Sequence, residues 1–210
     1  MKLSIITVNK DNALGLEQTF ASISKQSSHD FEYIVIDGNS SDRSKDLIQS
    51  FLPNIPYIWI SEPDNGIFSA MNKGLNLARG EYCLFLNSGD QLFDENVVKE
   101  FLLSGLSADI ISGREYIPSL NKTIVPPKPD RLTYDYFADN VLRHQSTFIR
   151  TALLLSYGGY NEAYRIVSDW EFWLKALIKD NATYQVLPRT VACFNLGGIS
   201  NQELYQQLKK

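Results

Sequence analysis

The turn that ends the stretch from Gly80 to Asp90 has the residue types of a metal and phosphate site. The run from Tyr82 to Leu86 is too short for a helix, and its unbroken apolar and aromatic character is typical of a strand buried on both faces of a parallel sheet. In open α/β sheets, ligands bind beyond the carboxyl ends of the strands, which is where Asn87-Ser88-Gly89-Asp90 would lie. An aspartate beside a glycine suits a divalent cation held against a phosphate, although all four residues are also common in ordinary turns.

A second acidic residue, Asp169, begins a predicted helix late in the chain. Ser168-Asp169-Trp170-Glu171 has the pattern of a capping box with Ser168 as the N-cap, which leaves the Asp169 carboxylate free. At helical spacing Asp169 shares a face with Phe172 and Trp173, so we expect it to point into a cleft as a candidate catalytic base. A first-turn aspartate that only stabilises the helix is the alternative.

The first half of the chain supplies the scaffold for such a site by alternating strands and helices. Four apolar strand-like runs each end in a polar turn, and segments with helical spacing separate them. This alternation predicts an α/β fold with a mostly parallel sheet and right-handed crossovers, so the four turns should converge on one edge. The predicted strands are Leu3 to Val8, Phe31 to Ile36, Tyr57 to Ile60 and Tyr82 to Leu86, and the predicted helices are Ala13 to Gln26, Lys45 to Leu52 and Ile67 to Ala78.

The second half is less regular, and prolines fill a loop-rich stretch that ends near Asn140. No linker-like boundary divides the chain, so we expect a single domain over residues 1–210. The predicted helices here are Glu95 to Leu103, Ser168 to Lys179 and a last one beginning at a Ser200 capping box after Gly197-Gly198; the predicted strands are Ala108 to Ser112, Gln145 to Ile149, Tyr184 to Leu187 and Val191 to Leu196.

Composition excludes several classes of protein. A hydrophobic share of 44%, a charged share of 21% and a net charge of −4 are those of a soluble globular protein and argue against a broad nucleic-acid surface. Cys83 and Cys193 lie in apolar runs without metal-ligand spacing, which suits reduced core residues in the cytoplasm. The apolar run at Leu3 to Val8 is too short for a signal peptide, and no stretch approaches the roughly 20 apolar residues of a spanning helix. We therefore expect any membrane contact to be peripheral.

The ordered set of motifs resembles a family 2 glycosyltransferase of the GT-A fold. Two further motifs, at residues 144–147 and 197–200, are similar to subgroups that build bacterial surface polysaccharides. The motifs are Thr7-Val8-Asn9, Asp37-Gly38-Asn39-Ser40-Ser41-Asp42, Glu62-Pro63-Asp64-Asn65-Gly66-Ile67-Phe68, Ala70-Met71-Asn72-Lys73-Gly74, Leu86-Asn87-Ser88-Gly89-Asp90, His144-Gln145-Ser146-Thr147, Ser168-Asp169-Trp170-Glu171 and Gly197-Gly198-Ile199-Ser200.

The resemblance implies a nucleotide-sugar-binding half at residues 1–112 and an acceptor-side half at residues 113–210. Thr7 and Asn9 would contact the base and ribose, and Asp37 would accept a hydrogen bond from a base that presents an N–H. Such an acceptor favours UDP-, dTDP- or GDP-sugars over CMP-sugars, because an ionised oxygen facing another acceptor is unpaired. Gly66 at a helix N-terminus and Gly89 are expected near the donor phosphates. Lys73 and Arg79 are candidate phosphate partners, with a solvated helix charge as the alternative for both and the favoured one for Arg79.

By the same resemblance, Asp90 would bind Mn²⁺ or Mg²⁺ with the donor diphosphate. The family's metal motif often has more than one aspartate, whereas positions 87 and 89 here are Asn and Gly. A single carboxylate remains compatible with Mg²⁺, which usually keeps several waters.

Asp169 would then be the base of an inverting transfer to a glycan or polyprenyl-linked glycan. His144 and Trp170 are candidate contacts to the acceptor or to phosphate, with structural roles as the alternative. Two other readings stay open: a catalytically silent sugar-nucleotide-binding module and a nucleotidyltransferase of similar fold. A Rossmann dehydrogenase is disfavoured, because no G-x-G-x-x-G follows the first strand.

Overall fold

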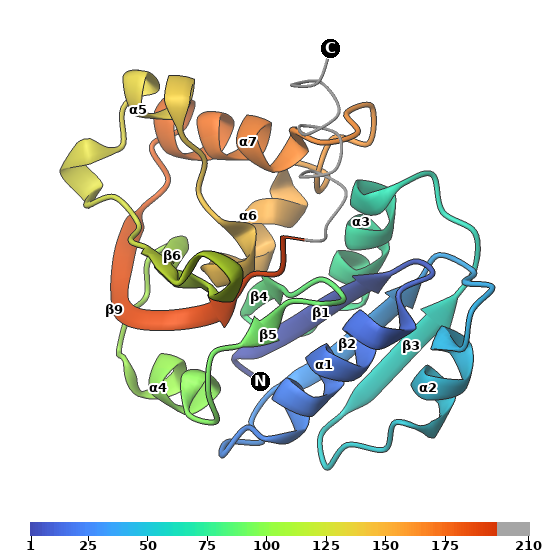
Figure 1. The fold of residues 1–210 in the computed structure, drawn as a ribbon. Coiled ribbons are helices and arrows are strands. Elements are labelled where there is room, and N and C mark those ends of the chain that lie inside the picture. Colours follow the sequence, from blue (N-terminus) through green and yellow to red (C-terminus); the bar gives the residue numbers. More distant parts are fainter. Residues whose placement is uncertain (197–210) are drawn as a thin grey trace.

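The computed structural model describes residues 1–196, which are built around one mixed β-sheet (Figure 1). Its strands β1 to β9 span, in chain order, Leu3–Asn9, Glu32–Asp37, Tyr57–Ser61, Tyr82–Phe85, Gln91–Leu92, Ile110–Ile117, Lys122–Ile124, Thr147–Arg150 and Tyr184–Cys193. They are hydrogen-bonded in the order β3-β2-β1-β4-β8-β6-β9-β5, and β7 pairs with β6 outside this path.

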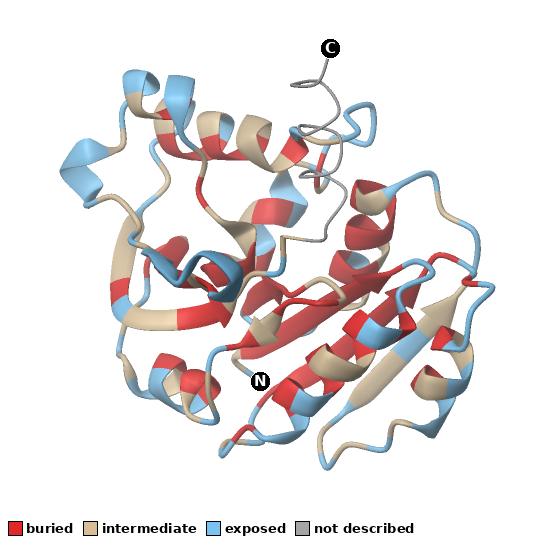
Figure 2. Ribbon diagram, viewed as in Figure 1, coloured by how far each residue is buried: buried red, intermediate tan, exposed pale blue. Residues whose placement is uncertain are grey.

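The first four strands are parallel to one another, with β1 between β2 and β4 and with β3 outside β2. Every residue of β1, β2 and β4 is buried, as the unbroken apolar runs require (Figure 2). The predicted mostly parallel α/β sheet is therefore confirmed.

Helices cover both faces of this sheet and form two cores. Buried side chains of α1 (Ala13–Ser24), α2 (Ser44–Ser50) and α4 (Val97–Leu103) pack on one face. Buried side chains of α3 (Ile67–Leu77), α5 (Tyr134–Asp139), α6 (Thr151–Ser156) and α7 (Ser168–Trp173) pack on the other. None of the helices within residues 1–196 combines the length and the apolar character needed to cross a membrane.

The second half extends the same sheet. β8 lies between β4 and β6 and is antiparallel to both. β9 then runs parallel to β6 and antiparallel to β5, the short strand that follows the turn after β4. The chain after β4 thus returns to the sheet next to the turn that carries Asp90.

Several predicted elements of the second half differ in the structure. The two strands predicted around residues 184–196 are one strand, β9, because Pro188 lies where the pairing with β6 shifts register between Ser112 and Arg114, and no ladder bond is needed from a proline there. The late helix is α-helical only to Trp173 and continues as a π-helix over Leu174–Lys179. The last predicted helix and the Gly197-Gly198 pair lie outside the described residues.

Candidate active site

The polar turns after β1, β2, β3 and β4 meet at the carboxyl edge of the sheet, as predicted. Asn9 and Asp37 are register partners at the ends of β1 and β2, and Asp37 pairs in the same way with Ser61 of β3. The turn after β4 joins them, since the Ser88 N–H donates to the Val8 carbonyl at 3.1 Å. Asp37 and Asp90 therefore lie along one edge.

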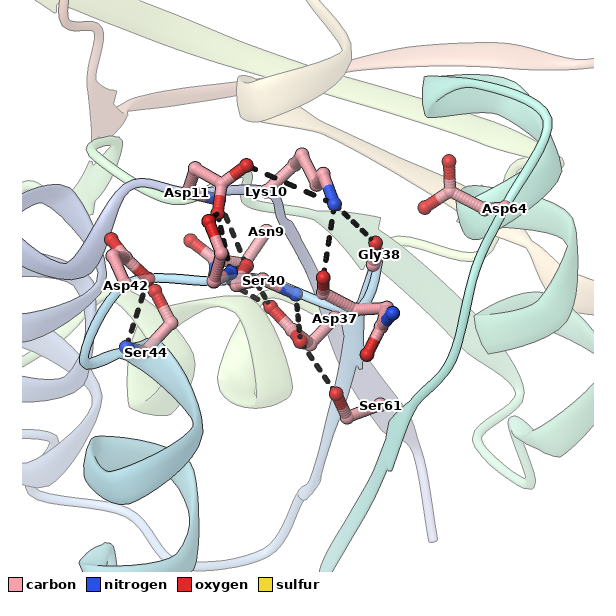
Figure 3. Close-up of polar contacts among 12 residues, drawn as sticks. Asn9, Lys10, Asp11, Asp37, Gly38, Ser40, Asp42, Ser44, Ser61 and Asp64 are labelled. Atoms are coloured by element: carbon pink, nitrogen blue, oxygen red, sulfur yellow. Dashed lines mark hydrogen bonds and ion pairs between the residues drawn. The ribbon is translucent and has the colours of Figure 1, made fainter.

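Asp37 is fully buried at this edge, and its carboxylate is saturated with hydrogen bonds (Figure 3). Oδ1 accepts from Asn9 Nδ2 at 2.8 Å and from the Ser40 hydroxyl, while Oδ2 accepts from Ser40 N at 2.9 Å and from Ser61 Oγ at 2.6 Å. Burial would raise the pKa of this carboxyl, but the bonds from Ser40, Ser61 and Asn9 outweigh it and lower the pKa. A carboxylate has about four lone-pair sites, so the predicted base contact by Asp37 has no acceptor left to use in this structure.

Two neighbouring aspartates bind the loops in the same manner. Asp11 accepts from the Ser41 N–H at 2.6 Å, and Asp42 accepts from the Ala13 N–H at 2.9 Å. Lys10 closes the group by donating to the carbonyls of residues 38 and 39 at 2.7 and 3.0 Å. The loops after β1 and β2 are thus cross-linked by the hydrogen bonds of these exposed side chains (Figure 3).

Thr7 and Asn9 support this edge from below its surface. The Thr7 hydroxyl donates to the Leu86 carbonyl at 2.6 Å and accepts from the Tyr33 hydroxyl at 2.8 Å. Both Thr7 and Asn9 are buried, Asn9 at 4% exposure. Each holds two strand ends together.

The predicted phosphate residues divide between two places. Gly66 opens α3 with φ +123°, a backbone conformation that favours glycine, at the same carboxyl edge. Lys73 also lies there, paired with Glu62 at 2.8 Å. Arg79 does not, because its N–H donates to Glu32 at the start of β2, the opposite edge of the sheet. Arg79 is also exposed, which fits the solvated helix charge that was the favoured interpretation of this residue.

The turn after β4 places Gly89 and Asp90 against α1. Gly89 has φ +104° and donates its N–H to Thr19 Oγ1 at 3.0 Å, and that hydroxyl donates to the Asp90 carbonyl at 2.7 Å. The Asp90 side chain is buried at 4% exposure and accepts a bond from the Asn195 N–H at 3.1 Å. Burial raises the pKa of Asp90 to about 7, with the bond from Asn195 opposing it.

His144 connects this turn to α7. Its Nδ1 lies 3.0 Å from Asp169 Oδ2 and its Nε2 lies 3.3 Å from Asn87 Nδ2. Burial would lower the pKa of His144, but the hydrogen bond to Asp169 and the charges of Asp169, Asp90 and Glu115 outweigh burial and raise it. The imidazole is therefore a favourable site for positive charge among acidic groups.

Glu115 is a further buried acid beside His144. Both of its carboxylate oxygens are buried without a hydrogen bond among the described residues, and Arg143 Nε lies 3.7 Å away. Burial raises the pKa of Glu115, while Arg143 and His144 oppose the shift. The sequence did not point to Glu115, because the predicted strand ended at Ser112 and placed this residue in a loop.

Asp169 faces inward as predicted, but the helix begins differently. Val167 occupies the N-cap position, Ser168 makes no capping bond, and Glu171 pairs with Lys175 at 2.8 Å instead of bonding back. The predicted capping box is therefore wrong. The inward direction is confirmed, because Phe172 and Trp173 on the same face are buried in the core.

Trp170 anchors α7 to the segment before it. Its indole N–H donates to the Phe137 carbonyl at 2.7 Å, and its backbone N–H donates to Asp169 Oδ1 at 2.9 Å. Both bonds hold the start of α7, and thereby the Asp169 carboxylate, in place.

The oxygen atoms around Asp90 fit a hard divalent cation. Asn87 Oδ1 is buried without a hydrogen bond among the described residues, and it belongs to the same turn as the Asp90 carboxylate. Residues 1–196 contain no group of three His, Cys, Asp or Glu side chains arranged to hold a metal. Mg²⁺ or Mn²⁺ bound here would thus take its other ligands from water and phosphate.

Comparisons with known proteins agree with this geometry. The family model described as glycosyl transferase family 2 matches residues 4–152. A PGL/p-HBAD biosynthesis glycosyltransferase from Mycobacterium tuberculosis is 32% identical over 205 residues, which cover 94% of this chain and 78% of that protein. An uncharacterized glycosyltransferase from the same species is 31% identical over 182 residues, covering 84% of this chain and 69% of the relative.

Solved structures share the fold at lower identity. S. aureus TarS in complex with UDP-GlcNAc superposes with a TM-score of 0.77 at 20% identity, covering 96% of this chain and 61% of the TarS chain. The mannosyltransferase PcManGT from Pyrobaculum calidifontis, in complex with GDP-Man and Mn²⁺, gives a TM-score of 0.73 at 14% identity, with coverages of 97% and 59%. This chain spans less than two thirds of either solved chain. Family model, relatives and fold together show that the chain belongs to glycosyltransferase family 2, with the GT-A fold.

Proposed function

We propose that this glycosyltransferase moves a sugar from a UDP-, dTDP- or GDP-sugar to a hydroxyl of a glycan or polyprenyl-linked glycan, with inversion at the anomeric carbon. The observation that carries the proposal is the bridge made by His144, which contacts Asp169 on α7 and Asn87 in the turn after β4. This bridge brings the inward carboxylate of the acceptor-side half next to the turn where a diphosphate would lie.

In the proposed reaction Asp169 Oδ2 takes the proton of the acceptor hydroxyl while that oxygen attacks the anomeric carbon. The new glycosidic bond forms as the bond from the anomeric carbon to the diphosphate breaks, and the nucleoside diphosphate leaves from the opposite face. His144 positions Asp169 through the contact between its Nδ1 and Asp169 Oδ2.

The donor is proposed to lie along the carboxyl edge built by Thr7, Asn9, Asp37, Gly66, Lys73 and Gly89. Asp90 and Asn87 Oδ1 would hold Mn²⁺ or Mg²⁺, which supplies positive charge for the leaving diphosphate. Support comes from the structural relatives, which were solved with UDP-GlcNAc and with GDP-Man and Mn²⁺.

A biosynthetic role is supported by the relative that is named a PGL/p-HBAD biosynthesis glycosyltransferase. We propose that the protein works in the cytoplasm and touches the membrane peripherally where a polyprenyl-linked acceptor would lie. Surface polysaccharide assembly is the process that fits this arrangement.

The test is paired kinetics and donor titration on Asp169→Asn. Loss of the base should reduce turnover by about 10²–10⁴, while the donor dissociation constant changes little, because the base belongs to the acceptor side. Release of nucleoside diphosphate from UDP-, dTDP- and GDP-sugars is measured with Mn²⁺ and polyprenyl-linked or simple glycoside acceptors.

Glu171→Gln is the matched control, because Glu171 starts the same helix but pairs with Lys175. Turnover of Asp169→Asn within a few-fold of wild type would remove Asp169 as the base. Donor binding by a wild-type protein that turns over no donor would instead favour a silent binding module.

A further inference from the structure

Asp64, in the loop between β3 and α3, occupies the space that a side chain at position 38 would fill. A Cβ atom at Gly38 would lie only 2.5 Å from Asp64 Oδ2 and 3.2 Å from Cδ of Lys10. Figure 3 shows the Asp64 carboxylate directed toward the loop that carries Gly38. Gly38 has no positive φ that would require glycine, so the close approach of Asp64 accounts for the missing side chain.

The two oxygens of Asp64 differ in their bonding. Oδ1 accepts the Gly66 N–H at 3.0 Å, which accounts for the turn before α3. Oδ2 accepts no hydrogen bond from any residue of the described chain, and Asp64 is only partly buried. On the neighbouring loops, both oxygens of Asp37 and of Asp42 accept hydrogen bonds from the protein. Asp11 Oδ1 accepts from Ser41, and its Oδ2 lies 3.8 Å from Lys10 Nζ. Asp64 Oδ2 is therefore available to a ligand.

The position of Asp64 along the edge suits a nucleobase better than a phosphate. The turn with Asp90 follows β4, whereas Gly38 follows β2, and β1 lies between these strands. Two strand spacings separate the sites by about 10 Å, so a nucleotide with its diphosphate at Asp90 extends its base toward β2. A carboxylate repels phosphate, and it attracts an N–H at the edge of a base.

We propose that Asp64 Oδ2 accepts the hydrogen bond of the ring N–H of uracil, thymine or guanine, and so selects the donor nucleotide. This inference rests on the proposed function. In it Asp37 is a positioning residue that holds the loop after β2, and Gly38 keeps the space in which Asp64 reaches the base. Cytosine and adenine present an acceptor at the same edge and would leave the carboxylate unpaired.

The experiment measures binding of UDP, GDP, CDP and ADP to the full chain by calorimetry with Mg²⁺ present, for wild type, Asp64→Asn and Asp30→Asn. Asp30 is an exposed aspartate at the amino end of β2, so Asp30→Asn removes the same charge far from the site. Wild type and Asp30→Asn should bind UDP or GDP at least about tenfold more tightly than CDP and ADP, as one lost hydrogen bond to a charged group predicts.

Asp64→Asn should lose about 10- to 100-fold in UDP or GDP affinity and most of the preference over CDP, because the amide presents both a donor and an acceptor. Gly38→Ala should reproduce the loss by displacing the carboxylate. An equal loss for all four nucleotides would overturn base recognition and place Asp64 on the ribose hydroxyls.

Unchanged affinity and preference in Asp64→Asn would also overturn the inference, while wild-type binding of UDP or GDP would leave the proposed function standing. A wild-type chain that binds none of the four nucleotides would contradict the proposed function itself.

Discussion

The loops after β1 and β2 and the turn after β4 both carry aspartates at the carboxyl edge of the sheet. The surroundings shift the pKa of Asp37 and the pKa of Asp90 in opposite directions. Asp37 is fully buried, and four hydrogen bonds overcome the burial and lower its pKa. Asp90 is nearly as buried, yet burial dominates there and raises its pKa to about 7. Glu115 also has a pKa raised by burial, and its negative charge contributes to the raised pKa of Asp90.

The difference depends on how many hydrogen-bond donors the chain places around each carboxylate. Burying a charged oxygen is costly unless hydrogen bonds replace water. Where the chain supplies all the donors, as at Asp37, the acid holds loops together and has nothing left for a ligand. Where it supplies few, as at Asp90, the carboxyl has a raised pKa and oxygen sites that hydrogen bonds from the described residues do not fill. Three predictions test this contrast.

The largest effect is expected from Asp37→Asn. The amide replaces an oxygen that accepts from Ser40 N and Ser61 Oγ, so one buried and one half-buried donor would lose their acceptor. At about 1–3 kcal/mol per unsatisfied group, we expect the free energy of unfolding to fall by about 3 kcal/mol. Thermal unfolding at pH 7 should show a midpoint lower by about 6–12 °C for a chain of this size. A shift below about 2 °C would mean that the network does not hold this edge.

The same substitution at the other site, Asp90→Asn, should increase the free energy of unfolding at neutral and alkaline pH. Asp90 titrates near 3.8 when unfolded and near 7 when folded, so between these values the folded state keeps a proton that the unfolded state has lost. Wild-type stability therefore falls as pH rises from about 4 to 7, and Asp90→Asn removes that loss.

Without divalent cations, Asp90→Asn should be about 2 kcal/mol more stable than wild type at pH 8 and equal to it at pH 4. Thermal midpoints across this range measure the effect. Adding Mn²⁺ at pH 8 should stabilise wild type alone. If the thermal midpoints of the two proteins changed with pH in parallel, Asp90 would not have the raised pKa on which this prediction rests.

The smallest effect concerns the pair of His144 and Asp169. The folded pKa of His144 is raised above its usual 6.5, chiefly by Asp169 against the effect of burial. The stability from this pair is thus complete below pH 6.5 and is lost as pH rises through the folded pKa. Asp169→Asn should lower the His144 pKa and cost about 1 kcal/mol at pH 6.

NMR titration of the imidazole C–H signals measures this directly, because the chain has only two histidines. The exposed His29 supplies a second signal that should not respond to Asp169→Asn. A His144 pKa unchanged by the substitution would show that Asp169 does not raise it, which would contradict the prediction.

The sequence was sufficient for the fold of the first half and for the direction of Asp169. Unbroken apolar runs and the polar turns that follow them are local patterns, and helical spacing alone places Asp169 on the face of Phe172. These features depend on neighbours in the chain, which a sequence displays.

The charge state of the site depends on partners that the sequence does not place. Ser61, which completes the bonding of Asp37, is 24 residues away, and Asp169 is 25 residues from His144. Nothing in the motif around Asp37 distinguishes a saturated carboxylate from a free one. The break predicted between Leu187 and Val191 is absent for a related reason, because β9 accommodates Pro188 where the pairing with β6 shifts register.

The place of β8 between β4 and β6 has a consequence for how this chain can be divided. Without β8, the edge of β4 would expose a row of unpaired N–H and C=O groups, a template for association with other chains. A fragment of residues 1–112 would therefore be expected to self-associate through that edge. Residues 1–112 thus depend on β8, a strand from the second half of the chain, to cover the edge of β4.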